Sequence, residues 1–169
     1  MNSRIKTLSL FACGAIVSSL AFSATTASAL YKRESATACM IRTDTDNAVY
    51  IGSSGVWNYS TVANQSIGCA VNDDDRFRKQ DIVTLNIHGY DGSTTLPVEA
   101  VTCVSYWGSN GGACGSWVDS SWGGTGNYTL SPPLTYWTSN YYADFGFVYV
   151  TLPKYESSVS SFRGYFIAN

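Results

Sequence analysis

Side chains suited to acid–base chemistry are scarce in this sequence, because its 169 residues include a single histidine, His88. A serine hydrolase needs an imidazole beside a serine and a carboxylate, and the sequence has no G-x-S-x-G elbow or other nucleophile signature. His88 also falls at an outward position of a strand expected over residues 81–90, where a solvated histidine is the ordinary outcome. The pattern therefore predicts no catalytic triad.

Two carboxylates at a fixed separation in a groove could instead cleave glycosidic bonds. Glu99 and Asp144 lie on expected strands, but almost any β-protein offers such a pair. We therefore predict a protein without catalytic activity and keep a small secreted hydrolase as the third functional hypothesis.

Oxygen ligands of the kind that calcium prefers occur in two turns, over residues 44–47 and 73–75. Neither turn matches an EF-hand loop, which requires a glycine at position six and a glutamate at position twelve. Basic residues that follow the second turn can pair with its carboxylates: Arg76, Arg78 and Lys79. We predict no metal site and no cofactor, and the weak calcium candidates are Asp73, Asp74 and Asp75.

Aromatic side chains make up 14% of the chain, with five tryptophans and twelve tyrosines. Sugars present apolar C–H faces that stack on such rings, and neighbouring polar groups then bind the hydroxyls. Several rings lie near glycine-rich segments, and loops carry a disproportionate share of binding residues. The candidates for a carbohydrate-binding surface are Trp107, Trp117, Trp122, Tyr136, Trp137, Tyr141 and Tyr142. For each single ring the alternative is a place in the core or over a sheet end.

The cysteines give the clearest indication of the strands that must position these residues. Residues 98–118 read as a strand, a glycine-rich turn and a second strand, with Cys103 and Cys114 on the two arms. A turn between them could bring the two arms face to face, so we favour this disulfide, which leaves Cys39 to pair with Cys69. Four cysteines allow three pairings, and the other two stay open at this point. A zinc site would need close pairs such as C-x-x-C, and there are none.

The N-terminal residues 1–29 have the features of a secretory signal peptide. Arg4 and Lys6 precede a short apolar run, and small residues follow at Ala27-Ser28-Ala29. The apolar run of roughly 15 residues is shorter than the about 20 that a membrane-spanning helix needs. A membrane anchor, or a lipid attached at Cys13, is the alternative. We expect residues 30–169 to form one secreted domain, extracellular or periplasmic, with no membrane insertion after cleavage.

Charge excludes some partners. The whole chain has a net charge of −2, and cleavage after residue 29 would remove two basic residues and bring it near −4. A negative protein is a poor ligand for nucleic acid or for an anionic membrane. The expected partners are a polysaccharide or another surface protein.

Short strands separated by Gly, Ser, Asn and Pro turns fill the rest of the chain, and no segment after the signal shows a helical period. Val83, Leu85 and Ile87 alternate on one face of the strand over 81–90. Residues 143–152 are apolar on both faces, which predicts a central strand.

At the two ends of the mature chain, we expect residues 30–35 to be frayed and residues 36–42 to form a short first strand. Phe162, Gly164 and Phe166 are expected on one face of the last strand. Eight or nine such strands predict an all-β fold, an antiparallel β-sandwich or jelly roll stapled by disulfides.

Segments near both ends of the mature chain resemble small exported proteins of environmental bacteria. The resemblance is carried by Cys39, by Gly55-Val56-Trp57-Asn58-Tyr59-Ser60, by Ser66-Ile67-Gly68-Cys69-Ala70-Val71, by Val150-Thr151-Leu152-Pro153 and by Ser160-Ser161-Phe162-Arg163-Gly164-Tyr165. It implies a β-sandwich and no activity. One departure is that this family would have a cysteine just before the Leu-Pro pair, paired back to the Cys103 strand. This sequence has Val150 and Thr151 there and offers Cys114 instead.

Together these patterns favour a secreted, non-catalytic binding or surface-associated module, with carbohydrate as the expected ligand class. A structural or protein-interaction role in the envelope or extracellular matrix is the alternative. An exposed coplanar row of tryptophans would favour the first hypothesis, and a long uncovered edge strand would favour the second. A groove that holds His88 beside a serine or a carboxylate would favour the hydrolase.

Overall fold

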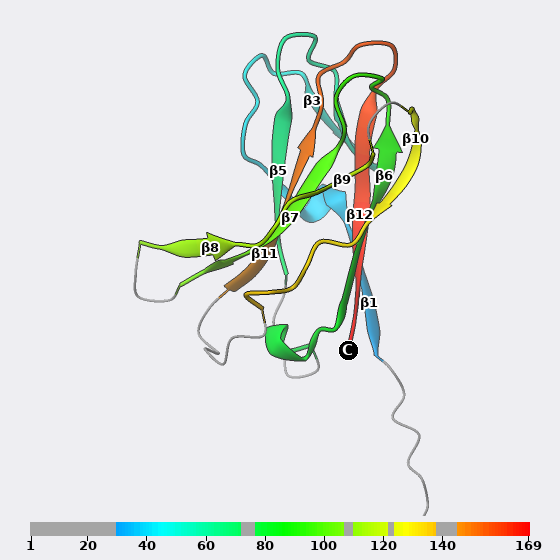
Figure 1. The fold of residues 1–169 in the computed structure, drawn as a ribbon. Coiled ribbons are helices and arrows are strands. Elements are labelled where there is room, and N and C mark those ends of the chain that lie inside the picture. Colours follow the sequence, from blue (N-terminus) through cyan, green and yellow to red (C-terminus); the bar gives the residue numbers. More distant parts are fainter. Residues whose placement is uncertain (1–29, 72–76, 107–109, 122–123, 138–144) are drawn as a thin grey trace, which may run out of the picture.

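The computed structural model describes residues 30–71, 77–106, 110–121, 124–137 and 145–169. These residues form twelve strands and two short 3-10 helices, η1 (Ala36–Ala38) and η2 (Lys79–Asp81). The strands build two antiparallel sheets that pack together (Figure 1), so the predicted all-β sandwich is confirmed. The described part of the chain has no helix with the length and apolar character of a membrane span.

Sheet A has the strand order β10-β6-β12-β4-β3, and β1 also pairs with β12. Its strands are β1 (Tyr31–Ser35), β3 (Val49–Gly52), β4 (Gly55–Asn58), β6 (Thr84–Asp91), β10 (Gly126–Leu130) and β12 (Ser160–Ala168). Sheet B has the order β2-β5-β11-β7-β8, and β9 also pairs with β7. Its strands are β2 (Met40–Ile41), β5 (Gln65–Ala70), β7 (Glu99–Ser105), β8 (Gly112–Cys114), β9 (Val118–Asp119) and β11 (Phe145–Leu152). The consecutive strands β11 and β12 therefore lie in the middle of opposite sheets.

The core lies between the sheets and follows the period-two alternation of the strands. On β11, Val148, Val150 and Leu152 are fully buried, and on β6 the buried hydrophobic residues are Leu85 and Ile87. Alternate residues of a strand point to opposite faces, so the residues between these point away from the core. β11 bonds to both β5 and β7, which confirms the predicted central strand.

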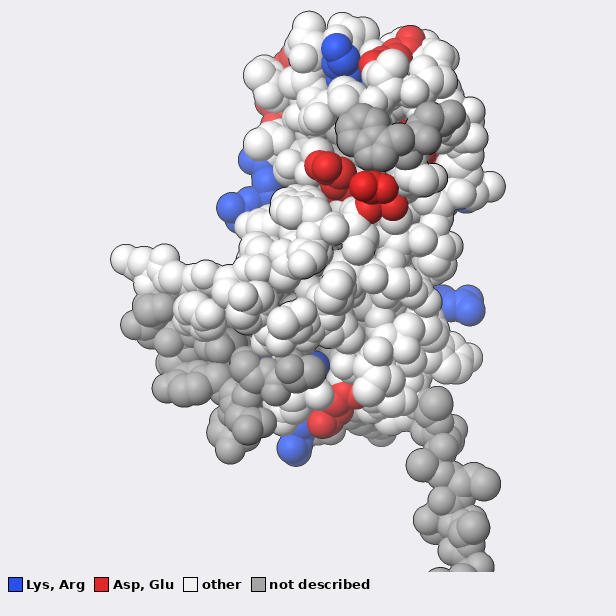
Figure 2. All heavy atoms as spheres, viewed as in Figure 1, with Lys and Arg blue, Asp and Glu red and all other residues white. Residues whose placement is uncertain are grey.

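Charged residues are few on the outside of this sandwich. Figure 2 shows small, separated groups of acidic and basic side chains on a face that is otherwise neutral. This agrees with a chain in which only 13% of residues are charged. Net charge alone therefore gives little guidance to what such a face would bind.

Both disulfides have the pairing that the sequence favours, Cys39–Cys69 and Cys103–Cys114. Cys103 and Cys114 are direct cross-strand partners on β7 and β8. Each closure restricts the unfolded chain and adds about 2–4 kcal/mol to stability. Two disulfides are typical of proteins that fold in an oxidising compartment.

A β-bulge in β12 changes the faces expected for the last strand. The register against β6 shifts between Phe162 and Gly164, so Arg163 is an extra residue on β12. Phe162 is buried before the bulge, and Tyr165 and Ile167 are buried after it. The prediction that Phe162, Gly164 and Phe166 share one face is wrong, because the bulge shifts the alternation by one residue.

Three further expectations near the strand ends are wrong. Residues 30–35, expected to be frayed, include β1, which pairs with β12 from Tyr31↔Ala168 to Ser35↔Gly164. β4 covers only the first part of the same edge of β12, so β1 provides hydrogen-bond partners for the remainder. The strand expected over residues 36–42 is reduced to β2 because η1 precedes it. Val83, expected to point inward, is 73% exposed because β6 begins at the next residue.

Asn58 joins the two sheets through a fully buried amide. Its Nδ2 lies 3.1 Å from the carbonyl oxygen of Leu152 and 2.9 Å from that of Pro153, at the end of β11. Its Oδ1 accepts a bond of 2.9 Å from the Ser60 N–H. Buried carbonyl groups need partners because leaving them unpaired costs about 1–3 kcal/mol each. Asn58 therefore fixes the end of β11 against β4.

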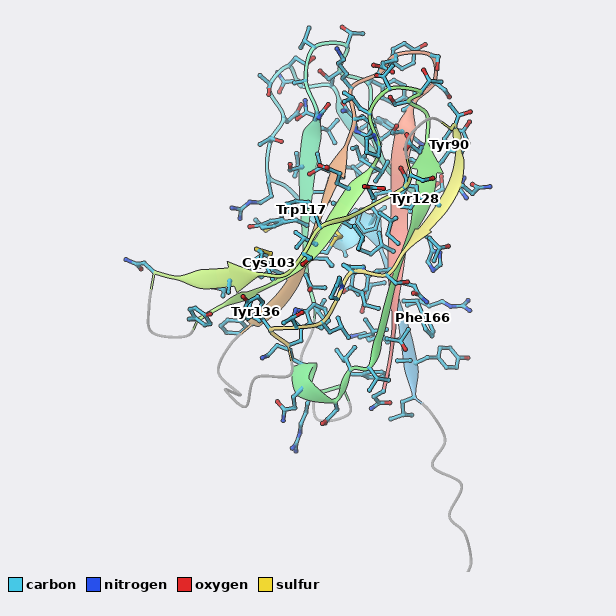
Figure 3. The ribbon with its side chains drawn as sticks, viewed as in Figure 1. Tyr90, Cys103, Trp117, Tyr128, Tyr136 and Phe166 are labelled. Carbon is cyan, nitrogen blue, oxygen red and sulfur yellow. A yellow bond between two sulfur atoms is a disulfide. The ribbon has the colours of Figure 1, made fainter. Side chains whose placement is uncertain are left out.

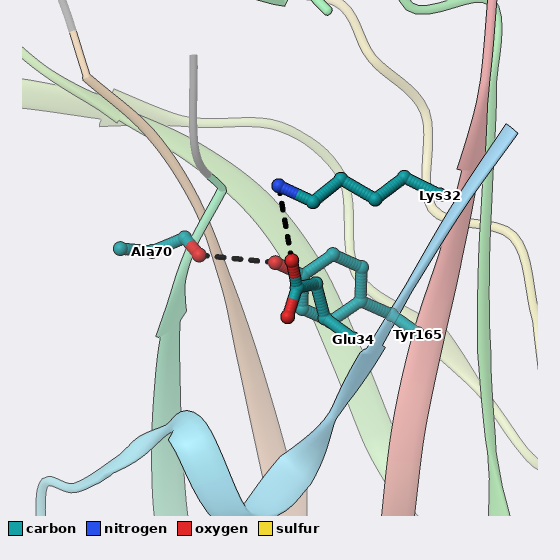
Figure 4. A network of polar contacts seen from close by, with 4 residues as sticks. All are labelled: Lys32, Glu34, Ala70 and Tyr165. Carbon is teal, nitrogen blue, oxygen red and sulfur yellow. Dashed lines mark hydrogen bonds and ion pairs between the residues drawn. The ribbon is translucent and has the colours of Figure 1, made fainter. Parts of the chain in front are cut away.

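Two buried tyrosines on other strands also donate their hydroxyls to backbone carbonyl groups. Tyr128 (labelled in Figure 3) donates to the Ser161 carbonyl oxygen at 3.0 Å. Tyr165 of sheet A donates to the Ala70 carbonyl oxygen of sheet B at 3.0 Å, beside the Lys32–Glu34 ion pair (Figure 4). Burial raises the pKa of both hydroxyls well above the ordinary value, and the Asp91 carboxylate adds to this at Tyr128. Both tyrosines therefore stay neutral in the folded protein in alkaline solution.

We expect Asn58→Ala to lower the free energy of unfolding by about 2–4 kcal/mol, because it leaves buried carbonyl groups without a donor. The measurement is the urea midpoint at neutral pH. Asn127→Ala is the matched control, because Asn127 is exposed on β10. Equal midpoints for the two variants would show that Asn58 does not join the sheets.

We also expect the protein to lose stability as the pH rises above about 10, because the unfolded chain ionises its tyrosines there while folded Tyr128 and Tyr165 stay neutral. The pKa of each of these tyrosines is higher in the folded than in the unfolded protein. The stability that they contribute is therefore complete below pH 10 and is lost above it. Between pH 9 and pH 11, Tyr128→Phe should lose about 1.4 kcal/mol less than the unmodified protein. Urea unfolding at both pH values measures this, and Tyr50→Phe, at a 58% exposed tyrosine, should behave like the unmodified protein.

Candidate functional site

The outer face of sheet B carries an aromatic groove, which we call the sheet B groove. Its volume is 370 Å³. Because β11 buries its even-numbered residues, Phe147 and Tyr149 must point outward into this groove. The strand register sets Gly68 of β5 opposite Tyr149, and Met40 of β2 opposite Gly68. The full lining is Met40, Arg42, Gly68, Cys69, Ala70, Ser105, Phe147 and Tyr149.

The Tyr149 ring is held in the groove without being buried. A side chain at Gly68 would come within 3.2 Å of Tyr149 Cε1, so the glycine makes room for the ring. The Arg42 guanidinium carbon lies 5.4 Å from the ring centre, within the range of a cation–π contact. The Phe147 ring packs nearly perpendicular to it, with the centres 4.8 Å apart. Three contacts thus fix the orientation of a partly exposed ring.

Polar groups lie beside these rings. The Arg42 N–H donates to the Ser66 carbonyl oxygen at 2.8 Å, which places Arg42 alongside β5. Among the described residues no carboxylate pairs with the Arg42 guanidinium, so its donors are open to a ligand. The Ser66 and Thr151 hydroxyls lie 3.4 Å apart, one cross-strand pair further along the same face. The groove thus combines an apolar surface with hydrogen-bonding groups at its edge.

The sequence candidates do not gather in one place among the described residues. Trp117 is 52% exposed just before β9, and Tyr136 is 39% exposed. In the view of Figure 3 they are labelled on either side of Cys103. Trp137 is fully buried, and its indole N–H donates to the Cys103 carbonyl oxygen at 2.9 Å. Its assignment to a binding surface is wrong, because the ring is part of the core and its one donor is already bonded.

The remaining candidates lie outside the described residues. These are the aromatic residues Trp107, Trp122, Tyr141 and Tyr142 and the calcium candidates Asp73, Asp74 and Asp75. Within the described ranges, no group of three His, Cys, Asp or Glu side chains is placed to hold a metal ion.

His88 lies on the outward face of β6, as its position in the strand predicts. Its Nδ1 is 3.1 Å from the Thr129 hydroxyl on the neighbouring strand β10. No serine or carboxylate among the described residues forms a hydrogen bond with it. The contact that a serine hydrolase requires is therefore not made by this part of the chain.

Sequence reasoning missed the groove residues Arg42, Phe147 and Tyr149. The aromatic alternation of β11 was visible, but a strand that is apolar on both faces predicts burial on both. The remaining signal was Gly68, whose lack of a side chain matters only once the register sets it against Tyr149. Sequence spacing alone does not give that register.

Comparison with known proteins adds little. No family model and no curated protein matches this chain. Among solved structures, the chain is similar to that of TmCBM61 in complex with beta-1,4-galactotriose, with a TM-score of 0.34 and 11% identity. The match covers 81% of this chain and 86% of that one. Similarity at this level carries no argument about function.

Stability measurements can test whether Trp137 is buried in the core while Trp117 is exposed. We expect Trp137→Ala to lower the free energy of unfolding by about 3–5 kcal/mol, because it empties a core position and leaves a carbonyl unpaired. Trp117→Ala should change it by less than about 0.5 kcal/mol, because that ring is half exposed. Urea unfolding of both variants gives the answer. An equal loss in the two would contradict the placement of Trp137.

Proposed function

We propose that this protein is a non-catalytic carbohydrate-binding module that takes its ligand in the sheet B groove. One observation carries the proposal: the Tyr149 ring lies partly exposed over Gly68, oriented by Arg42 and Phe147. A preoriented ring loses little entropy when a sugar stacks on it. Trp117 and Tyr136 remain proposed contributors, as do the aromatic candidates outside the described residues.

The chemistry of the groove matches that of a sugar ring. The C–H face of a pyranose is apolar and packs on an aromatic ring, while its hydroxyls need donors and acceptors around the rim. Arg42 offers donors, and the Ser66 and Thr151 hydroxyls are both donors and acceptors. An open groove on a sheet face also suits a polymer, whose chain continues beyond the bound units.

A structural or protein-interaction role has less support. A long uncovered edge strand would favour such a role, because such edges pair with other chains. The outermost strands of sheet A are β3, with four residues, and β1 and β10, with five each. Strands this short offer few backbone groups to another chain, although β3 does expose Tyr50 and Ile51.

We further propose that residues 1–29 direct export and that residues 30–169 act outside the cytoplasm. The two disulfides support this assignment, because such bonds persist in oxidising compartments.

The proposal predicts that the oxidised protein, residues 30–169, is retained on at least one insoluble polysaccharide. We expect Tyr149→Ala to weaken retention at least about tenfold, because it removes the stacking surface. Depletion of the protein from solution over a panel of polymers, with and without calcium, measures this. A requirement for calcium would point to Asp73, Asp74 and Asp75.

Tyr50→Ala is the matched control, because Tyr50 is exposed on the other sheet. Loss of retention with this variant and not with Tyr149→Ala would move the site to sheet A. Retention on no polymer would contradict the proposal and favour a structural or protein-interaction role.

A further inference from the structure

A second hollow lies at β1, β6 and β12 of sheet A, away from the sheet B groove, and we call it the sheet A hollow. Its volume is 510 Å³. His88 comes from β6 and Arg33 from β1, while β12 supplies Arg163 and Phe166. The full lining is Arg33, Glu34, His88, Arg163, Gly164, Tyr165 and Phe166.

The β12 bulge builds this hollow. It makes Arg163 an extra residue and places Gly164 opposite both His88 and Ser35. Gly164 has a φ of 155°, and a side chain there would come within 2.3 Å of the Glu34 carbonyl oxygen. Only glycine fits this position, so the middle strand carries no side chain between His88 and Ser35. Bulges commonly redirect a side chain in this way.

The charges around the hollow are unbalanced. Of the described residues in the lining, Glu34 is the one acidic residue, and its carboxylate is engaged by Lys32 at 3.0 Å. Within the described ranges no carboxylate pairs with Arg33 or Arg163, and both arginines are exposed. Two guanidinium groups therefore face one hollow with their donors unpaired, on a chain whose net charge is negative. Guanidinium groups bind carboxylate, sulfate and phosphate oxygens through paired hydrogen bonds.

An aromatic wall stands beside these charges. Phe166 (labelled in Figure 3) is opposite Arg33 in the register, and its ring centre lies 6.0 Å from that of Tyr31. The Arg33 guanidinium carbon lies 5.9 Å from the Tyr31 ring centre, which holds the arginine near the wall. Tyr31 is 67% exposed, so its ring is open to a ligand. A free inorganic anion has no apolar surface that could pack on these rings, whereas a charged sugar has an apolar C–H face that does.

We propose that the sheet A hollow binds an anionic sugar unit, with Arg33 and Arg163 holding its charged group and the Phe166–Tyr31 wall packing on its ring. In taking the ligand to be a glycan this rests on the proposed function, but it assigns a separate site and a charged ligand class. The charged group is an oxyanion, either the carboxylate of a uronic acid or a sulfate ester. His88, held by Thr129, lies where it can bond a neighbouring hydroxyl.

The test compares charged polymers with their neutral counterparts. Polygalacturonate is paired with highly methyl-esterified pectin, and dextran sulfate with dextran. We expect residues 30–169 to bind at least one charged polymer at least about tenfold more tightly than its neutral counterpart at low salt. Arg33→Gln and Arg163→Gln should each reduce that binding about tenfold, and the double variant should abolish the preference. Binding of polygalacturonate but not dextran sulfate would identify a carboxylate as the ligand group. Binding of dextran sulfate alone would identify a sulfate ester.

Two control variants separate this inference from the proposed function. Arg42→Gln removes a charge in the sheet B groove, and Tyr149→Ala removes its ring; in either background, Arg33→Gln and Arg163→Gln should still reduce binding of the charged polymer about tenfold. Urea midpoints equal to that of the unmodified protein would show that the arginine variants are folded.

Binding of neutral polymers alone, or a charge preference that depends on Arg42 and not on Arg33 and Arg163, would overturn the inference while the proposed function stands. A charge preference that needs Arg33 and Arg163, with no effect of Tyr149→Ala on any polymer, would support the inference and contradict the sheet B groove.

Discussion

The buried amide of Asn58 is the contact on which the arrangement of the two central strands depends. Asn58 is paired with Ser160 at the start of β12 and donates to the carbonyl groups at the end of β11. It therefore fixes where one central strand ends and where the next begins, in two different sheets. A buried polar network of this kind gives register as well as stability, because a shift by one residue would leave its carbonyl groups unpaired.

Once β11 is fixed, both of its faces are determined. Val148, Val150 and Leu152 must fill the core, so Phe147 and Tyr149 must face outward. The groove is a direct consequence of packing the interior, because the same alternation produces both. What makes the outer face different from an ordinary solvated one is a neighbour without a side chain, Gly68, against which the Tyr149 ring can lie.

Much of the fold could be predicted from the sequence, because alternation and cysteine spacing are local signals. The sandwich, the central β11 and both disulfides follow from them. The bulge before Gly164 and the pairing of β1 with β12 could not be predicted, because both depend on register between segments far apart in the chain. The candidate site residues could not be predicted reliably for the same reason. Trp137 has the residue type expected of a sugar-binding site, but it is buried. Arg33, His88 and Arg163 come together only through the bulge.

The position of β1 has a consequence for how this chain folds. Tyr31, near the start of the described chain, pairs with Ala168, near its end. The first strand therefore has no partner until the last one has formed, and β12 in turn needs β6 and β4 from the middle. Contacts between residues so far apart in the chain are slow to form, since most of the entropy of loop closure is lost before they stabilise anything. A chain that stops short of β12 would leave sheet A without its central strand, so formation of this sheet waits for the C-terminal residues.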